Sequence, residues 1–112
     1  MAVKNKVLAI PLTNIASSTV SSSYQAINAT GLANPCFLIR IINASTTNVT
    51  VSYDGVTDNE YVIAASSMDV NAQTNGQPNT SIANFAAGTV VYVKGTAGTG
   101  NVYLSGYYQP TQ

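Results

Sequence analysis

The stretch Val90–Gln109, VVYVKGTAGTGNVYLSGYYQ, decides the fold class of this 112-residue chain. Large apolar residues alternate with smaller or polar ones on both sides of a glycine-rich centre, which is the pattern of two β-strands joined by a turn. Centred on Thr96–Thr99, the pattern predicts a C-terminal β-hairpin with one aliphatic side and one tyrosine-bearing side. The predicted cross-strand pairs are Val93 with Val102, Val91 with Leu104, and Tyr92 with Tyr103.

The rest of the chain has the same β character. Val, Ile, Thr and Tyr dominate its apolar runs, polar residues and glycine separate them, and no segment keeps a helical period. The predicted strands are Val3–Ile10, Tyr24–Ala29, Cys36–Asn43, Asn48–Tyr53, Tyr61–Ala64 and Met68–Ala72, and Ser81–Ala87 is either a strand or a helical turn. The sequence therefore predicts an all-β fold, a single antiparallel β-sandwich or small jelly roll of about 7–8 short strands with a C-terminal β-hairpin.

One domain is expected to span residues 1–112, because this length is typical of a single domain. Residues 1–12 are expected to form an extended N-terminal strand or arm, with Pro11 ending the strand. The run from Cys36 to Asn43 is the most apolar of the chain, and we predict a central strand with both faces covered.

Charged residues are scarce, and this limits the classes of partner. They make up 7% of the chain, against an average of about 25%, and four basic and four acidic side chains give a net charge of zero. Nucleic acid requires a basic stripe, which these few cations do not supply. No apolar run approaches the roughly 20 residues of a membrane-spanning helix. A neutral surface favours association with other proteins instead.

Catalytic and cofactor chemistry find little support in the sequence. There is no histidine, and the single cysteine, Cys36, lies in an apolar run and is expected to be a buried structural thiol. Asp54, Asp58 and Glu60 lie close together in DGVTDNE, where a calcium site is weighed against a solvated hairpin tip and the tip is favoured. A glycosidase would need a cleft around such carboxylates, which a small sandwich can hardly build. We expect no enzyme activity, no metal and no cofactor.

Arg40 is the single arginine and lies inside the most apolar predicted strand. Its charge must be paired or reach a partner, because burial of an isolated charge is prohibitive. Two alternatives stay open, namely a contact with another subunit and an internal ion pair. The candidate partners for the internal pair are Asp54, Asp58, Glu60 and Asp69.

Seven tyrosines and no tryptophan indicate a surface for contacts. Tyr107 and Tyr108 are adjacent, so a strand must direct them to opposite faces, and one can be core while the other is presented outward. Tyrosine offers a large, rigid contact area with a polar tip, which suits interfaces. It also stacks on sugars, so a carbohydrate platform is the alternative.

Two segments carry a resemblance to a known class of proteins. SYDGVTDNEYVIAA (residues 52–65) and AAGTVVYVKGTAGTGNVYLSGYYQ (residues 86–109) resemble small accessory structural proteins of tailed-bacteriophage virions, and the similarity extends over Phe37–Gln109. The resemblance implies a β-sandwich subunit, usually a symmetric oligomer, that binds the capsid lattice, the neck or the tail. It also implies a location in the virion, after assembly in the host cytoplasm, and it brings no catalytic residues.

These observations together predict a non-enzymatic virion structural protein. We expect a homo-oligomer that binds the major capsid protein or another virion protein and stabilises the capsid, as decoration or cement proteins do. The alternatives are a neck or tail component, and a carbohydrate-binding or receptor-binding β-sandwich module. The residues expected at the interface are Val3, Val7, Arg40, Tyr92, Tyr103, Tyr107 and Tyr108.

Overall fold

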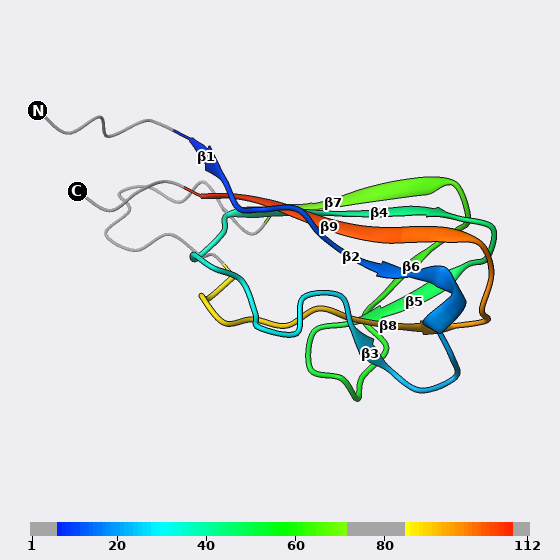
Figure 1. Cartoon of the computed structure of the whole chain (residues 1–112). Helices are drawn as coiled ribbons and strands as arrows, with labels where there is room; N and C mark the ends of the chain where they lie inside the picture. Colours follow the sequence, from blue (N-terminus) through cyan, green and yellow to red (C-terminus); the bar gives the residue numbers. More distant parts are fainter. Residues whose placement is uncertain (1–6, 72–84, 109–112) are drawn as a thin grey trace, which may run out of the picture.

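Two antiparallel sheets face each other in the computed structural model, which describes residues 7–71 and 85–108 (Figure 1). Sheet A has the order β1-β9-β4-β7, with β2 pairing the same strand β9 as β1, and sheet B has the order β3-β8-β5-β6. The elements are β1 (Leu8–Ala9), β2 (Thr13–Ala16), the 3₁₀-helix η1 (Ser17–Thr19), β3 (Gln25–Ala26), β4 (Leu38–Ser45), β5 (Val49–Ser52), β6 (Glu60–Val62), β7 (Ser66–Asn71), β8 (Tyr92–Gly95) and β9 (Gly100–Tyr108).

The connections alternate between the two sheets. The strands β2 and β3, β4 and β5, β6 and β7, and β8 and β9 are consecutive in the chain, yet each pair is divided between sheet A and sheet B. With β1 and β2 counted as one interrupted edge strand, the described residues form the eight-stranded, two-sheet arrangement of a jelly roll. The predicted all-β sandwich or small jelly roll is therefore confirmed.

The predicted C-terminal hairpin is wrong, although both of its strands exist. β8 pairs with β3 and β5 in sheet B, whereas β9 pairs with β4 in sheet A from Tyr107 opposite Leu38 to Gly100 opposite Ser45. Tyr92 and Tyr103 are therefore not a cross-strand pair. A hairpin would place both aliphatic sides on one surface, and a third element would have to cover it. Because the crossover puts β8 and β9 in different sheets, the aliphatic side of β8 and that of β9 cover each other across the core.

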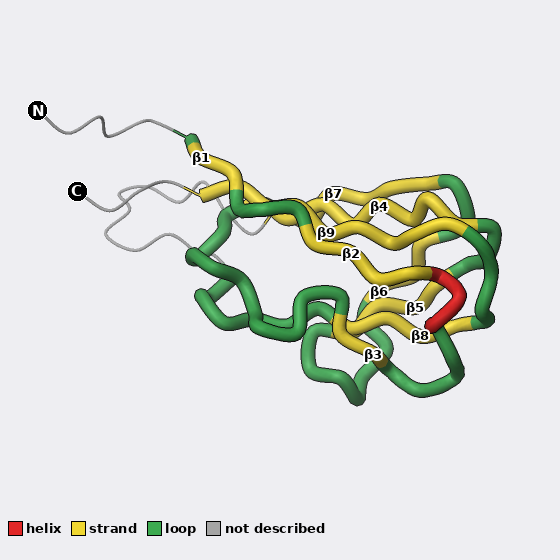
Figure 2. The backbone as a smooth tube through the Cα atoms, in the orientation of Figure 1, coloured by secondary structure: helices red, strands yellow, loops and turns green. Residues whose placement is uncertain are grey.

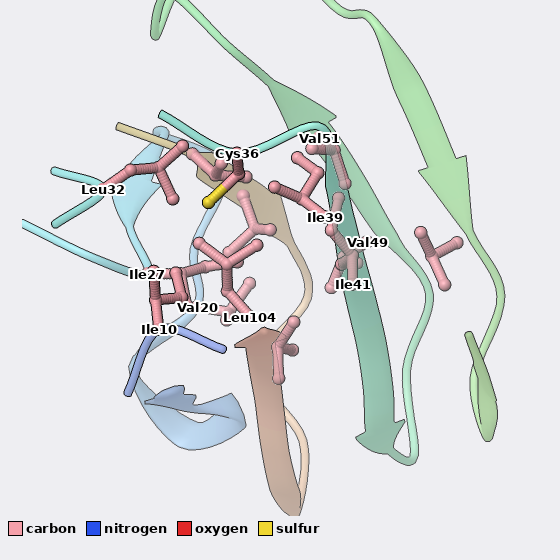
Figure 3. Close-up of a cluster of buried hydrophobic side chains, with 14 residues drawn as sticks. Ile10, Val20, Ile27, Leu32, Cys36, Ile39, Ile41, Val49, Val51 and Leu104 are labelled. Carbon is pink, nitrogen blue, oxygen red and sulfur yellow. The ribbon is translucent and has the colours of Figure 1, made fainter. Parts of the chain in front are cut away.

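The core lies between the two sheets and is built from aliphatic side chains on their facing sides (Figure 3). In sheet A, β4 and β9 direct alternate aliphatic side chains inward, and in sheet B, β5 and β8 do the same, as the period of two in a strand requires. These side chains are fully buried, which makes the contact between the sheets the main apolar burial in the described chain. They are Ile39, Ile41, Val102 and Leu104 from sheet A, Val49, Val51 and Val93 from sheet B, and Val91 just before β8.

The prediction that the central strand has both faces covered is wrong. β4 is central within its sheet, since β9 and β7 pair with its two edges. Its burial alternates, however, and Leu38, Arg40 and Ile42 on the outer side are only half-buried. In the described part of the chain, sheet B covers the inner side of β4 and no layer covers the outer side.

Four crossovers stand side by side at one end of the sandwich, at the right in Figures 1 and 2, where η1 begins the first of them. The N–H of Gly98 donates to the carbonyl of Ser17 at 3.3 Å, and the N–H of Thr46 donates to the carbonyl of Thr99 at 3.1 Å. The N–H of Ala64 donates to Oδ1 of Asn48 at 2.8 Å. Each crossover is thus bonded to the next, and the row closes this end of the core.

Glycine is required where the last crossover enters β9. Gly100 has a φ of +96°, which side chains other than glycine rarely allow. A Cβ atom there would lie 2.2 Å from the carbonyl oxygen of Ala44 on β4. The glycine in the predicted turn therefore serves the crossover and the close approach of two strands.

A buried polar network ties the crossovers to both sheets. Asn43 is fully buried on β4, and its Nδ2 donates to the carbonyls of Thr47 at 2.9 Å and Val62 at 3.0 Å. The hydroxyl of Ser45 donates to Oδ1 of Asn43 at 2.5 Å. One side chain thus links β4 in sheet A, the crossover that follows it, and β6 in sheet B.

The other predicted strands are present with shifted ends. β3 lies within Tyr24–Ala29, β5 within Asn48–Tyr53, and β5 and β6 form a hairpin around Asp54-Gly55 as predicted. Pro11 separates β1 from β2 because it has no N–H for the ladder. From Ser81–Ala87, Phe85 forms an isolated bridge with Cys36, and residues 81–84 lie outside the described residues, as do Val3 and Ala72. Within the described ranges, no helix has the length and apolarity to cross a membrane.

Asn43→Ala is expected to lower the free energy of unfolding by about 2–3 kcal/mol, because it leaves buried carbonyls without a donor. Urea unfolding followed by circular dichroism measures the change. Asn14→Ala is the matched control, since Asn14 bonds Asn101 at an exposed site and should cost less than about 0.5 kcal/mol. Equal costs at the two sites would contradict the role given to the Asn43 network.

Candidate interaction surface

The outer side of β4 carries apolar residues that no other described element covers. Leu38 lies directly opposite Tyr107 of β9, and Ile42 lies directly opposite Tyr103. Aliphatic–aromatic pairs of this kind stabilise a sheet by roughly 0.2–1 kcal/mol each. All four side chains are nevertheless only half-buried. We call this surface, together with Arg40 and Asp69, the outer face of sheet A.

Arg40 forms the internal ion pair that was one of the two predicted alternatives, and its partner is Asp69 on the neighbouring strand β7. Nε of Arg40 lies 2.6 Å from Oδ1 of Asp69, and Nη2 lies 3.2 Å from Oδ2, so the contact is bidentate. The hydrogen bonds with Arg40 hold the pKa of Asp69 below its usual value and raise that of Arg40. The two side chains are 41% and 47% exposed, so the ion pair presents a forked group without net charge to solvent. Along β4, Arg40 lies between the Leu38–Tyr107 pair and the Ile42–Tyr103 pair.

The predicted interface residues divide among three places. Tyr103 and Tyr107 join Arg40 on the outer face of sheet A. Tyr108 packs against the core, so Tyr107 and Tyr108 point to opposite faces as predicted. Tyr92 lies on the opposite side of the molecule, where its ring contacts Gly55.

The N-terminal candidates add little to this surface. Val7 is exposed just before β1, and Val3 lies outside the described residues. Sequence reasoning did not select Leu38 and Ile42, which complete the outer face. The sequence feature that could have identified these two residues is the nearly continuous apolar run of β4, which also fits a strand buried on both faces.

The carboxylates of DGVTDNE do not converge. Asp54 folds back on its own loop and accepts hydrogen bonds from the N–H groups of Val56 and Thr57, both at 2.8 Å. Asp58 reaches away to Lys94, whose Nζ lies 3.0 Å from its Oδ1, and accepts the hydroxyl of Tyr24. Among the described residues, no three Asp, Glu, Cys or His side chains lie close enough together to hold a metal ion.

These contacts set the ionisation of the loop. The backbone donors Thr57 and Val56, together with hydroxyl donors, hold the pKa of Asp54 well below its usual value. Burial and the hydrogen bond to Asp58 raise the pKa of Tyr24 to about 12. The loop is therefore held at two points, at Asp54 by hydrogen bonds from within the loop and at Asp58 by its contacts with Lys94 and Tyr24.

Cys36 is fully buried in the core, and burial raises the pKa of its thiol. A thiol in this state is a poor nucleophile, since reactivity belongs to the thiolate. The expectation of a buried structural cysteine is confirmed.

One solved structure is similar in fold to this chain. It is described as "Bacillus endospore appendages form a novel family of disulfide-linked pili", with a TM-score of 0.52 and 14% sequence identity over 99% of this chain and 96% of that chain. No protein-family model matches the chain, and no significant similarity to a curated protein sequence is found. At this identity the likeness supports the two-sheet fold.

Replacing Asp54 with Asn is expected to lower stability most at neutral pH. A carboxylate whose pKa is depressed in the folded state contributes stability that is fully present above its unfolded pKa, about 3.9. That contribution is lost as the pH falls through the lower folded pKa. The difference in unfolding free energy between wild type and Asp54→Asn should therefore shrink between about pH 7 and about pH 2.5. Urea unfolding across this range checks the prediction, and a difference independent of pH would refute it.

Proposed function

We propose that this chain is a non-enzymatic structural subunit that assembles with copies of itself through the outer face of sheet A. One observation carries the proposal: β4 is apolar on both sides, and only its inner side is covered in the described chain. Burying such a face against a second copy gains roughly 25 cal/mol for each Å² of apolar surface removed from water.

The composition of the face favours a protein partner. Tyrosine and arginine are enriched where proteins bind each other, and here two tyrosines flank the ion pair between Arg40 and Asp69. A second copy related by a two-fold axis could place the Arg40 of one subunit beside the Asp69 of the other, so that no charge is left unpaired. The net charge of zero adds little repulsion between copies.

The edges of sheet A supply further contacts. β7 and the β1/β2 edge end this sheet, and the terminal strands of a sheet carry backbone groups that can pair with another chain. The fold likeness to a pilus-forming appendage protein supports assembly from many copies. That assembly is described as disulfide-linked, whereas the single cysteine of this chain is buried. The contacts proposed here are therefore noncovalent.

The absence of enzyme activity is part of the proposal. The chain has no histidine and only four acidic residues, and general acid–base catalysis needs titratable groups positioned together. In the described residues, Asp54, Asp58 and Asp69 are engaged in separate structural contacts.

A role in a phage particle is a narrower form of the proposal. It would place the assembled subunits on a capsid, neck or tail, within a virion assembled in the host cytoplasm, and it rests on the sequence resemblance described above. Co-sedimentation of the protein with capsids tests the narrower form independently of self-association.

Tyr103→Asp is expected to convert an oligomer into a monomer, because it replaces an apolar contact beside Ile42 with an unpaired charge within the proposed interface. Sedimentation velocity at about 10 μM, a concentration at which micromolar contacts are occupied, measures the change. Val56→Asp is the control, since Val56 is 81% exposed in the loop outside sheet B. It should leave the oligomer intact. A monomeric wild-type protein, or an oligomer that survives Tyr103→Asp in a folded variant, would overturn the proposal.

A further inference from the structure

The outer face of sheet B is shaped by the loop of residues 53–59, which folds back across it (green, at the bottom of Figure 1). Gly55, with a φ of +80°, lies against the ring of Tyr92. Asp58 is held by Lys94 of β8 and by Tyr24 beside β3. Lys94 also lies over the Tyr24 ring, with Nζ 4.7 Å from its centroid. The loop is therefore fixed to β8 and to the residue that precedes β3, neither of which it joins.

Two adjoining hollows lie on this face, and Thr50 and Tyr61 line both. The first has a volume of about 390 Å³, and the second about 530 Å³, within the range of roughly 300–1,000 Å³ typical of small-molecule sites. The first hollow is lined by Thr50, Asp58, Asn59, Glu60 and Tyr61. The second is lined by Thr46, Thr47, Asn48, Thr50, Tyr61, Gly95 and Thr96. The Tyr61 side of the hollows is open, since this residue is 61% exposed.

Several polar groups at the hollows are not used by the fold. Asn48 and Asn59 each accept a backbone N–H with Oδ1, from Ala64 and Tyr53, which leaves their Nδ2 groups as donors. The Thr50 hydroxyl makes no hydrogen bond within the described chain, and it can both donate and accept. The carboxylate of Glu60 adds acceptors, as does Oδ2 of Asp58, whose Oδ1 is already bound to Lys94 and Tyr24. Donors and acceptors thus surround an exposed aromatic ring.

We propose that these hollows bind an uncharged saccharide, with the Tyr61 ring stacking on the apolar face of one sugar unit. Sugar hydroxyls both donate and accept, and they match the mixed groups of Thr50, Asn48 and Asn59. The negative charges of Asp58 and Glu60 disfavour an anionic sugar. The nearby cation Lys94 does not attract one, because it already pairs with Asp58. The fixed loop lowers the ordering cost of binding.

This site differs from the sugar platform that the adjacent tyrosines suggested. Tyr107 lies on the outer face of sheet A, and Tyr108 packs on the core. The proposed site is on the other sheet, so it stays open when copies associate through sheet A. The inference does not rest on self-association.

Saturation-transfer difference NMR tests the proposal on the full chain, because the method reads the ligand signal and tolerates large assemblies. The probes are the neutral oligomers maltotetraose, cellotetraose and chitotetraose, with tetragalacturonate as the anionic comparison. At least one neutral oligomer should bind, and tetragalacturonate should bind more weakly. Tyr61→Ala should weaken the neutral oligomer about tenfold, as expected for loss of one aromatic contact.

Ile63→Ala is the matched control. Ile63 follows β6 on the same side as Tyr61 and is 54% exposed, but it lines neither hollow. It should leave binding unchanged, and Thr50→Val should weaken binding while keeping the side-chain volume. No transfer from any neutral oligomer, or equal transfer with wild type and Tyr61→Ala, overturns the proposal. Loss of self-association in Tyr61→Ala without sugar binding also overturns it and assigns Tyr61 to a protein contact.

Discussion

The contact of two aliphatic surfaces across the sandwich is the constraint on which the rest of the structure depends. Ile39, Ile41 and Leu104 in sheet A meet Val51 and Val93 in sheet B. Because strands consecutive in the chain are divided between the sheets, the chain crosses the core repeatedly at one end. The close approach of Gly100 to β4 and the hydrogen bonds between crossovers follow from that connectivity. A few buried polar groups, chiefly Asn43, then satisfy the backbone at the closed end.

This arrangement decides what the two outer faces can do. Sheet A leaves an apolar face with two tyrosines and a self-paired arginine, which suits a flat partner such as another copy of the chain. Sheet B is partly covered by its own loop, and its remaining surface is hollowed and polar around Tyr61. The proposed assembly contact and the proposed saccharide site therefore occupy opposite sides of the molecule. Most charged side chains of the described residues either hold the loop or form the Arg40–Asp69 ion pair, so few are available for other chemistry.

The sequence predicted the buried aliphatic sides of the last two strands, and it failed to predict that β4 is covered on one side only and which strands pair. Val91, Val93, Val102 and Leu104 are buried as expected, because a period of two fixes the face of a strand. Two strands show the same period of two whether they form a hairpin or lie in different sheets. The pattern therefore could not exclude the predicted pairing of Tyr92 with Tyr103, which the structure does not contain. Asp69 was one of four candidates for Arg40, and only the register of β4 against β7 selects it. Tyr61 carried no sequence signal, because its surroundings depend on how the loop folds over sheet B.

Hydroxyl-radical footprinting of the tyrosines, above and below the concentration of assembly, tests the central claim most directly. If the uncovered side of β4 and β9 is the contact between copies, Tyr103 and Tyr107 become protected in the assembled sample. Tyr61 on the other sheet should react equally in both samples and serves as the internal reference. Equal modification of Tyr103 and Tyr107 at both concentrations, relative to Tyr61, would contradict the account.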